Sequence, residues 1–137
     1  VIIDMMPTDP SILGFSNIWY KPAMNNSISI KLPSNIEIRI FSVPYFLGAK
    51  VEAFNGRGKM DFLGSKDFED IIMLVDGRKE IRNDLYGAPE ELKNYLRREM
   101  KEWISNQDFL QSIAAHLPNE RRNAEGARRV VETLSNI

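Results

Sequence analysis

The chain has 137 residues, of which 43% are hydrophobic and 27% are charged, and its formal net charge is −1. These values are ordinary for one globular domain and give no general attraction to nucleic acid or anionic lipid, so no DNA binding is expected. The absence of cysteine excludes disulfides, thiolate metal sites and thiol catalysis together.

The beginning of the chain reads as a β-strand over residues 1–6. Asp4 interrupts this apolar segment, which therefore does not resemble a signal peptide, and no apolar run approaches the roughly 18 residues that cross a membrane. We expect a cytoplasmic protein without a membrane partner. Because the first residues have the character of an interior strand, we also expect the chain to be the C-terminal part of a longer protein.

The next segments predict a turn, an aromatic connection and a hairpin. Asp9 can cap a short helical turn that begins at Pro10, and residues 14–24 form the aromatic connection. Apolar and polar residues alternate in 27–32 and again in 36–41, which predicts a β-hairpin with one dry face and one wet face.

Helical periodicity dominates the rest of the chain. Helices are predicted over 43–55, over 66–76 with Ser65 as the N-cap, and over 79–86, and Pro89 opens a longer one. The inward stripes of the last helices are Leu92, Leu96, Met100 and Trp103, then Phe109, Leu110, Ile113, Ala114 and Leu117, then Ala127, Val130, Val131 and Leu134. Strands followed by helices predict an α+β fold in a single domain, with a core of residues 1–86 and a helical extension of 87–137.

Lys50 is the first candidate site residue, because it falls on the apolar stripe of the helix 43–55 beside Phe46 and Phe54. Its side chain could simply extend along the helix to water. Alternatively, its ammonium could neutralise Asp67 or Asp70, or contact a phosphate as a point charge. We expect it to approach one of the two carboxylates closely.

Asp67 and Asp70 lie three residues apart on one face of the helix 66–76. The helix dipole alone favours Asp67 in the first turn, whereas Asp70 lies one turn further, beside apolar residues. Arg57, Lys59 and Lys66 make a basic loop around these acids, which is either solvated or holds a triphosphate.

Asp4 and His116 are the remaining candidates. Asp4 is either a strand-end carboxylate near water or a ligand for a divalent cation, since Mg²⁺ prefers oxygen ligands. His116 is the only histidine and ends a helix, so a structural role is favoured and a zinc site is nearly excluded.

Four motifs in order carry a resemblance to a known family. The first 85 or so residues resemble bacterial nucleotidyltransferase-like proteins related to the abortive-infection (toxin–antitoxin) nucleotidyltransferases of the DNA polymerase β superfamily. The motifs are Ile2-Ile3-Asp4-Met5-Met6-Pro7-Thr8-Asp9, Leu13-Gly14-Phe15-Ser16-Asn17 with Trp19-Tyr20, Pro44-Tyr45-Phe46-Leu47-Gly48-Ala49-Lys50-Val51-Glu52-Ala53-Phe54 with Arg57-Gly58, and Ser65-Lys66-Asp67-Phe68-Glu69-Asp70.

The resemblance implies a nucleotidyltransferase-like fold, with a short mixed or antiparallel sheet followed by a C-terminal helical bundle. It also implies transfer of a nucleoside monophosphate from an NTP to an acceptor, with Mg²⁺ as cofactor and a protein, a transfer RNA or an antitoxin as further partner. Asp4 matches the third metal carboxylate and Lys50 the lysine that contacts the nucleotide phosphates. Lys66, Asp67 and Asp70 match the basic-acidic motif that supports the site.

One departure from the family is large. The Gly-Ser and paired Asp-x-Asp carboxylates of these enzymes occur nowhere in the chain. In the family they lie upstream of the position of Val1, so the chain carries about half of such a site. Two alternatives therefore stay open: a non-catalytic nucleotide-binding or toxin–antitoxin interaction protein, and a plain interaction domain in which the charges form only an ion-pair network.

Overall fold

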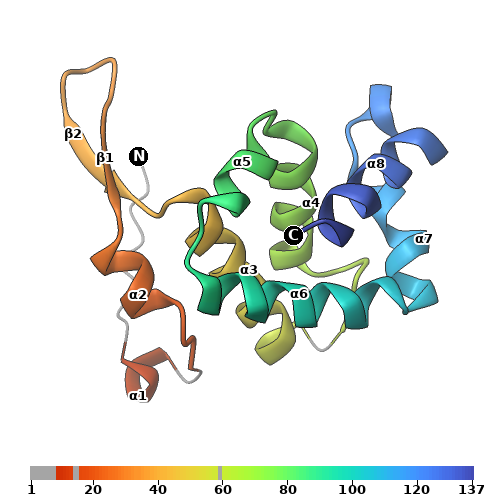
Figure 1. Cartoon of the computed structure of the whole chain (residues 1–137), viewed down its shortest axis with the longest axis horizontal. Helices are drawn as coiled ribbons and strands as arrows, with labels where there is room; N and C mark the ends of the chain where they lie inside the picture. Colours follow the sequence, from red (N-terminus) through yellow and green to blue (C-terminus); the bar gives the residue numbers. More distant parts are fainter. Residues whose placement is uncertain (1–8, 14–15, 59) are drawn as a thin grey trace.

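The computed structural model describes residues 9–13, 16–58 and 60–137 and gives a mainly helical α+β chain with one small sheet (Figure 1). The predicted strand 1–6, with Asp4, lies outside the described residues. No helix among those described is long and apolar enough to cross a membrane.

In chain order the elements are α1 Pro10–Leu13, α2 Tyr20–Asn25, β1 Ile28–Lys31, β2 Glu37–Ile40, α3 Val43–Arg57, α4 Lys66–Gly77, α5 Ile81–Tyr86, α6 Glu90–Ile104, α7 Gln107–His116, the 3₁₀ turn η1 Asn119–Arg121 and α8 Ala124–Ser135.

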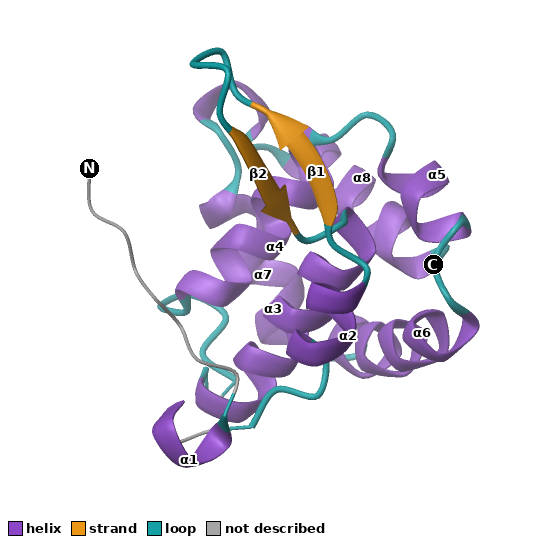
Figure 2. Cartoon of the chain, turned by 90° about the vertical axis from the view of Figure 1, so that its left-hand side faces the viewer, coloured by secondary structure: helices purple, strands orange, loops and turns teal. Residues whose placement is uncertain are grey.

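The predicted hairpin is confirmed as an antiparallel pair in which Ile28 lies opposite Ile40 and Ile30 opposite Ile38. Its turn contains Asn35 with a φ of 68°, a left-handed conformation that asparagine tolerates better than most residues. The hairpin stands on one side of the helices, with α2 beneath it (Figure 2).

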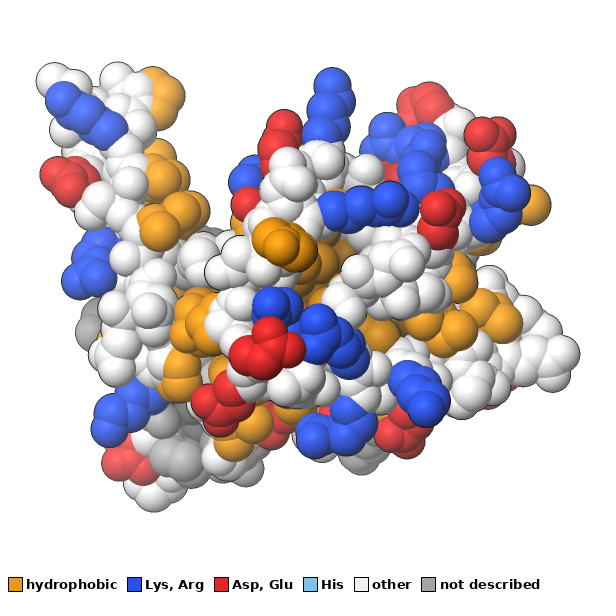
Figure 3. Space-filling view, in the orientation of Figure 1, with side chains coloured by type: hydrophobic (Ala, Val, Ile, Leu, Met, Phe, Trp, Pro, Cys, Tyr) orange, Lys and Arg blue, Asp and Glu red, His pale blue; other side chains and the backbone are white. Residues whose placement is uncertain are grey.

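The prediction that one face of this hairpin is dry was wrong. Ile28 remains 47% exposed and Ile40 37% exposed, because the two strands contact mainly each other. Hydrophobic side chains accordingly line one side of the hairpin in the space-filling view (Figure 3). Alternation in the sequence fixes which side chains share a face, but it does not decide whether another layer covers that face.

The core lies where α3, α4, α6, α7 and α8 pack together. Its centre is an aromatic cluster with ring centroids 4.9 to 6.1 Å apart. Many of the contacts are edge-to-face, the geometry that the quadrupoles of aromatic rings favour. The cluster consists of Phe54, Phe62, Phe68, Trp103 and Phe109. Because α3 and α4 both contribute to it, their relative position is fixed independently of any charged contact between them.

The predicted helices are present, with small shifts at their ends. The helix predicted over 79–86 begins at Ile81, and Pro89 is the residue before α6 and not part of its first turn. Ser65 caps α4 as predicted, because its side chain accepts a hydrogen bond from the Phe68 amide.

Candidate functional site

One face of α3 forms the centre of the candidate site. Phe46, Ala49, Lys50, Ala53 and Arg57 recur at spacings of three and four residues, which place them on one side of a helix. All five line an open cavity of about 560 Å³. The sequence predicted instead that Phe46 and Lys50 belong to the inward stripe. The structure turns them to the cavity, while the opposite sides of α3 are buried.

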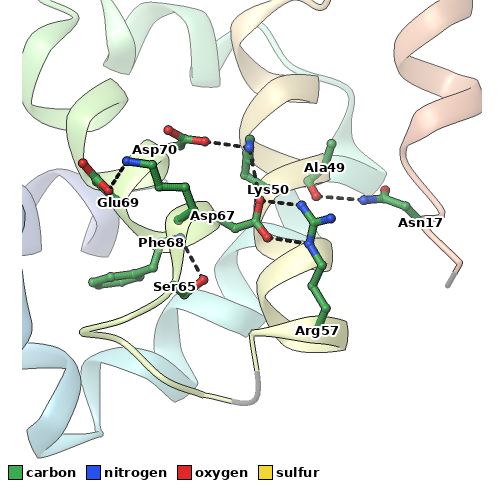
Figure 4. Close-up of polar contacts among 10 residues, drawn as sticks. Asn17, Ala49, Lys50, Arg57, Ser65, Asp67, Phe68, Glu69 and Asp70 are labelled. Carbon is green, nitrogen blue, oxygen red and sulfur yellow. Dashed lines mark hydrogen bonds and ion pairs between the residues drawn. The ribbon is translucent and has the colours of Figure 1, made fainter. Parts of the chain in front are cut away.

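Lys50 approaches both carboxylates of α4, as predicted (Figure 4). Its Nζ lies 3.1 Å from Asp67 Oδ1 and 2.6 Å from Asp70 Oδ2. The same atom lies 5.6 Å from the centroid of the Phe46 ring, a cation–π contact. Burial alone would lower the pKa of Lys50, but the hydrogen bonds and charges of Asp70 and Asp67 outweigh it and raise the pKa. Lys50 is therefore held as an ammonium ion.

Arg57, at the end of α3, completes the cluster. Its Nε and Nη2 donate to the two oxygens of Asp67 over 2.8 and 2.9 Å, the bidentate geometry that a guanidinium and a carboxylate share. Figure 4 shows Asp67 between the two cations, with Lys50 on one side and Arg57 on the other. The hydrogen bond to Asp67 is the main cause that raises the pKa of Arg57.

Asp67 is the anchor of this cluster, although the sequence indicated Asp70 as the less easily explained acid. The Asp67 side chain is only 6% exposed, against 39% for Asp70. Burial tends to raise the pKa of Asp67, but the hydrogen bonds and charges of Arg57 and Lys50 hold it below its ordinary value. Asp67 lies two residues after its N-cap Ser65, where the helix dipole adds to this stabilisation.

The cavity wall facing α3 comes from the hairpin and α2, and sequence reasoning missed these residues. Tyr20, Met24, Arg39 and Phe41 line it together with the α3 face and Asp67. Arg39 and Phe41 alternate with Ile38 and Ile40, so their side chains lie on the opposite face of the hairpin. That alternation can be read from the sequence, but the position of this side across the cavity from α3 cannot.

Asn17 ties the segment before α2 to the site. Its Nδ2 donates to the carbonyl oxygen of Ala49 over 2.8 Å, and its Oδ1 accepts from the Trp19 amide over 3.1 Å. Trp19 itself is buried against the rings of Tyr45 and Tyr95. The hydrogen bonds of Asn17 and the packing of Trp19 hold the start of α2 against α3, at the residue that precedes Lys50.

Two of the other predicted site residues, Lys66 and His116, are described, and each has a hydrogen-bond partner outside the group of Lys50, Arg57, Asp67 and Asp70. Lys66 donates to Glu69 over 2.7 Å, and its side chain is 81% exposed, which fits the solvated alternative for the basic loop. Asp4 and Lys59 lie outside the described residues. His116 contacts the Phe62 carbonyl oxygen through Nε2 at 2.7 Å and packs on the Phe68 ring, as a structural histidine does.

The described part of the chain does not gather carboxylates in the way that a divalent cation requires. Asp67 and Asp70 both face Lys50, and Asp67 also faces Arg57, so both oxygens of Asp67 and one oxygen of Asp70 accept from cationic donors. In residues 9–13, 16–58 and 60–137, no group of three His, Asp or Glu side chains could hold a metal ion. What the cluster can do is present an ammonium and a guanidinium, both held in place, to an anionic ligand in the cavity.

Comparison with known proteins adds no relative. No family model, no curated protein and no solved structure matches this chain.

Proposed function

We propose that this chain is the nucleotide-binding part of a nucleotidyltransferase-like protein, which transfers a nucleoside monophosphate from an NTP in a Mg²⁺-dependent reaction. The observation that carries the proposal is the position of Lys50, whose ammonium is held by Asp67 and Asp70 on the wall of an open cavity. The resemblance of the four ordered motifs to that family points to the same lysine.

The donors of Lys50 support a role in phosphate binding. An ammonium has three N–H groups, and two of them serve Asp67 and Asp70. The third has no hydrogen-bond acceptor among the described residues and is available to a phosphate oxygen. The two carboxylates fix the position of the ammonium, so that little side-chain entropy is lost when the ligand binds.

The composition of the cavity supports a nucleotide over a simple anion. Tyr20, Phe41 and Phe46 supply aromatic surface on which a base can stack, while Lys50 and Arg39 supply positive charge. The volume of about 560 Å³ falls in the range of small-molecule sites.

The fit to Mg²⁺ is poor among the described residues, because Asp67 and Asp70 are engaged by cations. We therefore assign no metal ligand and no catalytic step to them. Asp4 remains the metal carboxylate that the family resemblance predicts.

Calorimetric titration of the 137-residue chain with ATP, GTP, CTP and UTP tests the proposal. We expect at least one NTP to bind and Lys50→Met to weaken its binding about tenfold or more, because a charge-assisted hydrogen bond contributes about 1.5–3 kcal/mol. Lys50→Arg should restore part of the affinity, since it keeps the charge but not the geometry.

Lys101→Met is the matched control, because Lys101 is an exposed lysine on α6 that does not line the cavity. It should bind the NTP like the wild type. If no NTP binds, or if Lys50→Met binds as tightly as the wild type while lowering only stability, the cluster is a structural clamp between α3 and α4 and the proposal fails.

A further inference from the structure

A second buried carboxylate lies at the opposite end of α4. The Asp76 side chain is 1% exposed, and it accepts from Arg121 Nε on Oδ2 over 2.6 Å and from Arg129 Nη2 on Oδ1 over 2.9 Å. A carboxylate in the last turn of a helix is opposed by the helix dipole, so this acid depends on its arginines. One negative charge thus holds two guanidinium groups side by side.

Gly126 allows the close contact between η1 and α8 that places Arg121 and Arg129 near each other. Gly126, in the first turn of α8, packs so closely on η1 that an added Cβ would collide with the carbonyl oxygen of Arg121. The Asn123 side chain accepts from the Gly126 amide over 2.9 Å and fixes the same turn. Arg121 from η1 and Arg129 from α8 therefore converge on Asp76 through a close backbone contact that only glycine permits.

The two guanidinium groups line a hollow of about 370 Å³ together with the end of α4 and the start of α5. Figure 3 shows Lys and Arg side chains, interspersed with acidic ones, over this end of the molecule near α5 and α8. Five cationic side chains face the hollow against the single carboxylate of Asp76; they are Arg78, Lys79, Arg82, Arg121 and Arg129.

Acidic side chains around the hollow neutralise only part of this charge. Asp84 pairs with Arg78, and Glu132 lies 3.7 Å from Arg82. Among the described residues Lys79 forms no ion pair. The hollow therefore keeps an excess of positive charge in a chain whose net charge is −1.

We propose that this hollow is a binding site for phosphate groups, separate from the cavity beside Lys50. Arg121 donates through Nε and Arg129 through one Nη to Asp76, which leaves each guanidinium further N–H groups for a second anion. Planar guanidinium groups match phosphate oxygens in bidentate geometry, and Lys79 adds a point charge at the rim. The phosphate can belong to a free pyrophosphate or to the backbone of RNA, which present the same oxygens.

Titration of the ¹⁵N-labelled chain with inorganic pyrophosphate and with an oligouridine tests the site. We expect the amide signals of Lys79, Arg82 and Val130 to shift. The double variant Lys79→Gln/Arg82→Gln should weaken binding about tenfold or more, since both exposed cations face the ligand. Neither residue touches Asp76, so the variant retains the buried arginine pair and its melting temperature checks the fold.

Lys21→Gln/Lys31→Gln removes the same charge from α2 and β1, on the far side of the molecule (Figure 1), and should bind as the wild type does. An RNA ligand predicts binding that strengthens with oligomer length and falls steeply with salt, whereas a free phosphate ligand predicts binding of pyrophosphate alone. Shifts confined to signals around Lys50, no binding of either probe, or equal losses in the two double variants would each overturn the proposal.

Discussion

Replacing Asp67 by asparagine should lower the free energy of unfolding by about 2–3 kcal/mol at neutral pH. Asparagine keeps the shape of the side chain but removes the charge that holds Lys50 and Arg57. The change tests whether this buried carboxylate is the anchor of the cluster between α3 and α4.

The magnitude follows from the three hydrogen bonds that Asp67 accepts, one from Lys50 and two from Arg57. The asparagine oxygen can accept one of them, so about two charge-assisted bonds are lost, at about 1.5–3 kcal/mol each. Arg57 is 45% exposed, and solvent screening reduces its share toward the value of a surface pair. Lys50 retains Asp70 as a partner, which also limits the loss.

The pH dependence gives an independent check. Because the pKa of Asp67 is lowered in the folded chain, the unfolded chain binds the proton more readily, and the contribution is present above the ordinary value of 3.8. It is lost as pH falls through the lowered native pKa. The difference between wild type and Asp67→Asn should therefore be constant above about pH 5 and shrink at lower pH.

Urea unfolding at pH 7 and at several acidic values measures this difference, with Asp70→Asn as the matched control. Asp70 is partly exposed, and Lys50 is its only ion-pair partner among the described residues, so its variant should lose only about 0.5–1 kcal/mol. Equal losses in the two variants, or a loss for Asp67→Asn that does not change with pH, would refute the assignment of Asp67 as the anchor.

Three further predictions concern two glycines and the transfer of nucleotides. Gly56→Ala should raise the free energy of unfolding by about 0.5–1 kcal/mol, because an added Cβ in α3 meets no atom within 4 Å. Gly126→Ala should lower the free energy of unfolding by about 2 kcal/mol or more, because the added Cβ collides with the carbonyl oxygen of Arg121. Urea unfolding of the two glycine variants measures both changes. The 137-residue chain should transfer no labelled nucleotide to protein or transfer RNA in the presence of Mg²⁺, because Asp4 alone cannot hold two metal ions. Labelling that survives Asp4→Ala would contradict the metal role predicted for that residue.

Much of the local structure could be predicted from the sequence, because it depends on short-range signals. Alternation predicted the hairpin, the Ser65 cap predicted the start of α4, and periodicity predicted the helices from α3 onward, whereas α2 lies in the segment that was expected to be an aromatic connection. The contact between Lys50 and Asp67 was also predictable, since an unpaired ammonium on an apolar helix is costly.

The errors arose where tertiary packing decides the outcome. Periodicity placed Lys50 and Phe46 on the inward stripe of α3, but this helix is buried on several sides, and only the position of α2 and β2 decides which face lines a cavity. The burial of Asp67 in preference to Asp70 likewise depends on Arg57 reaching back from the end of α3. Arg121 and Arg129 escaped notice because their partner Asp76 lies more than 40 residues away in the sequence.

The two charged sites share one helix, and this arrangement has a physical consequence. Helix α4 carries a nearly buried carboxylate at each end, Asp67 in its first turn and Asp76 in its last, and each holds two cations from other elements. At the first turn the helix dipole and the cations act together, whereas at the last turn the arginines must also offset the dipole. Removing one arginine at Asp76 should therefore cost more stability than removing Arg57 from Asp67, even though each acid keeps one cation. The contacts of Asp67 therefore have a larger energetic margin than those of Asp76, because the helix dipole supports the first acid and opposes the second.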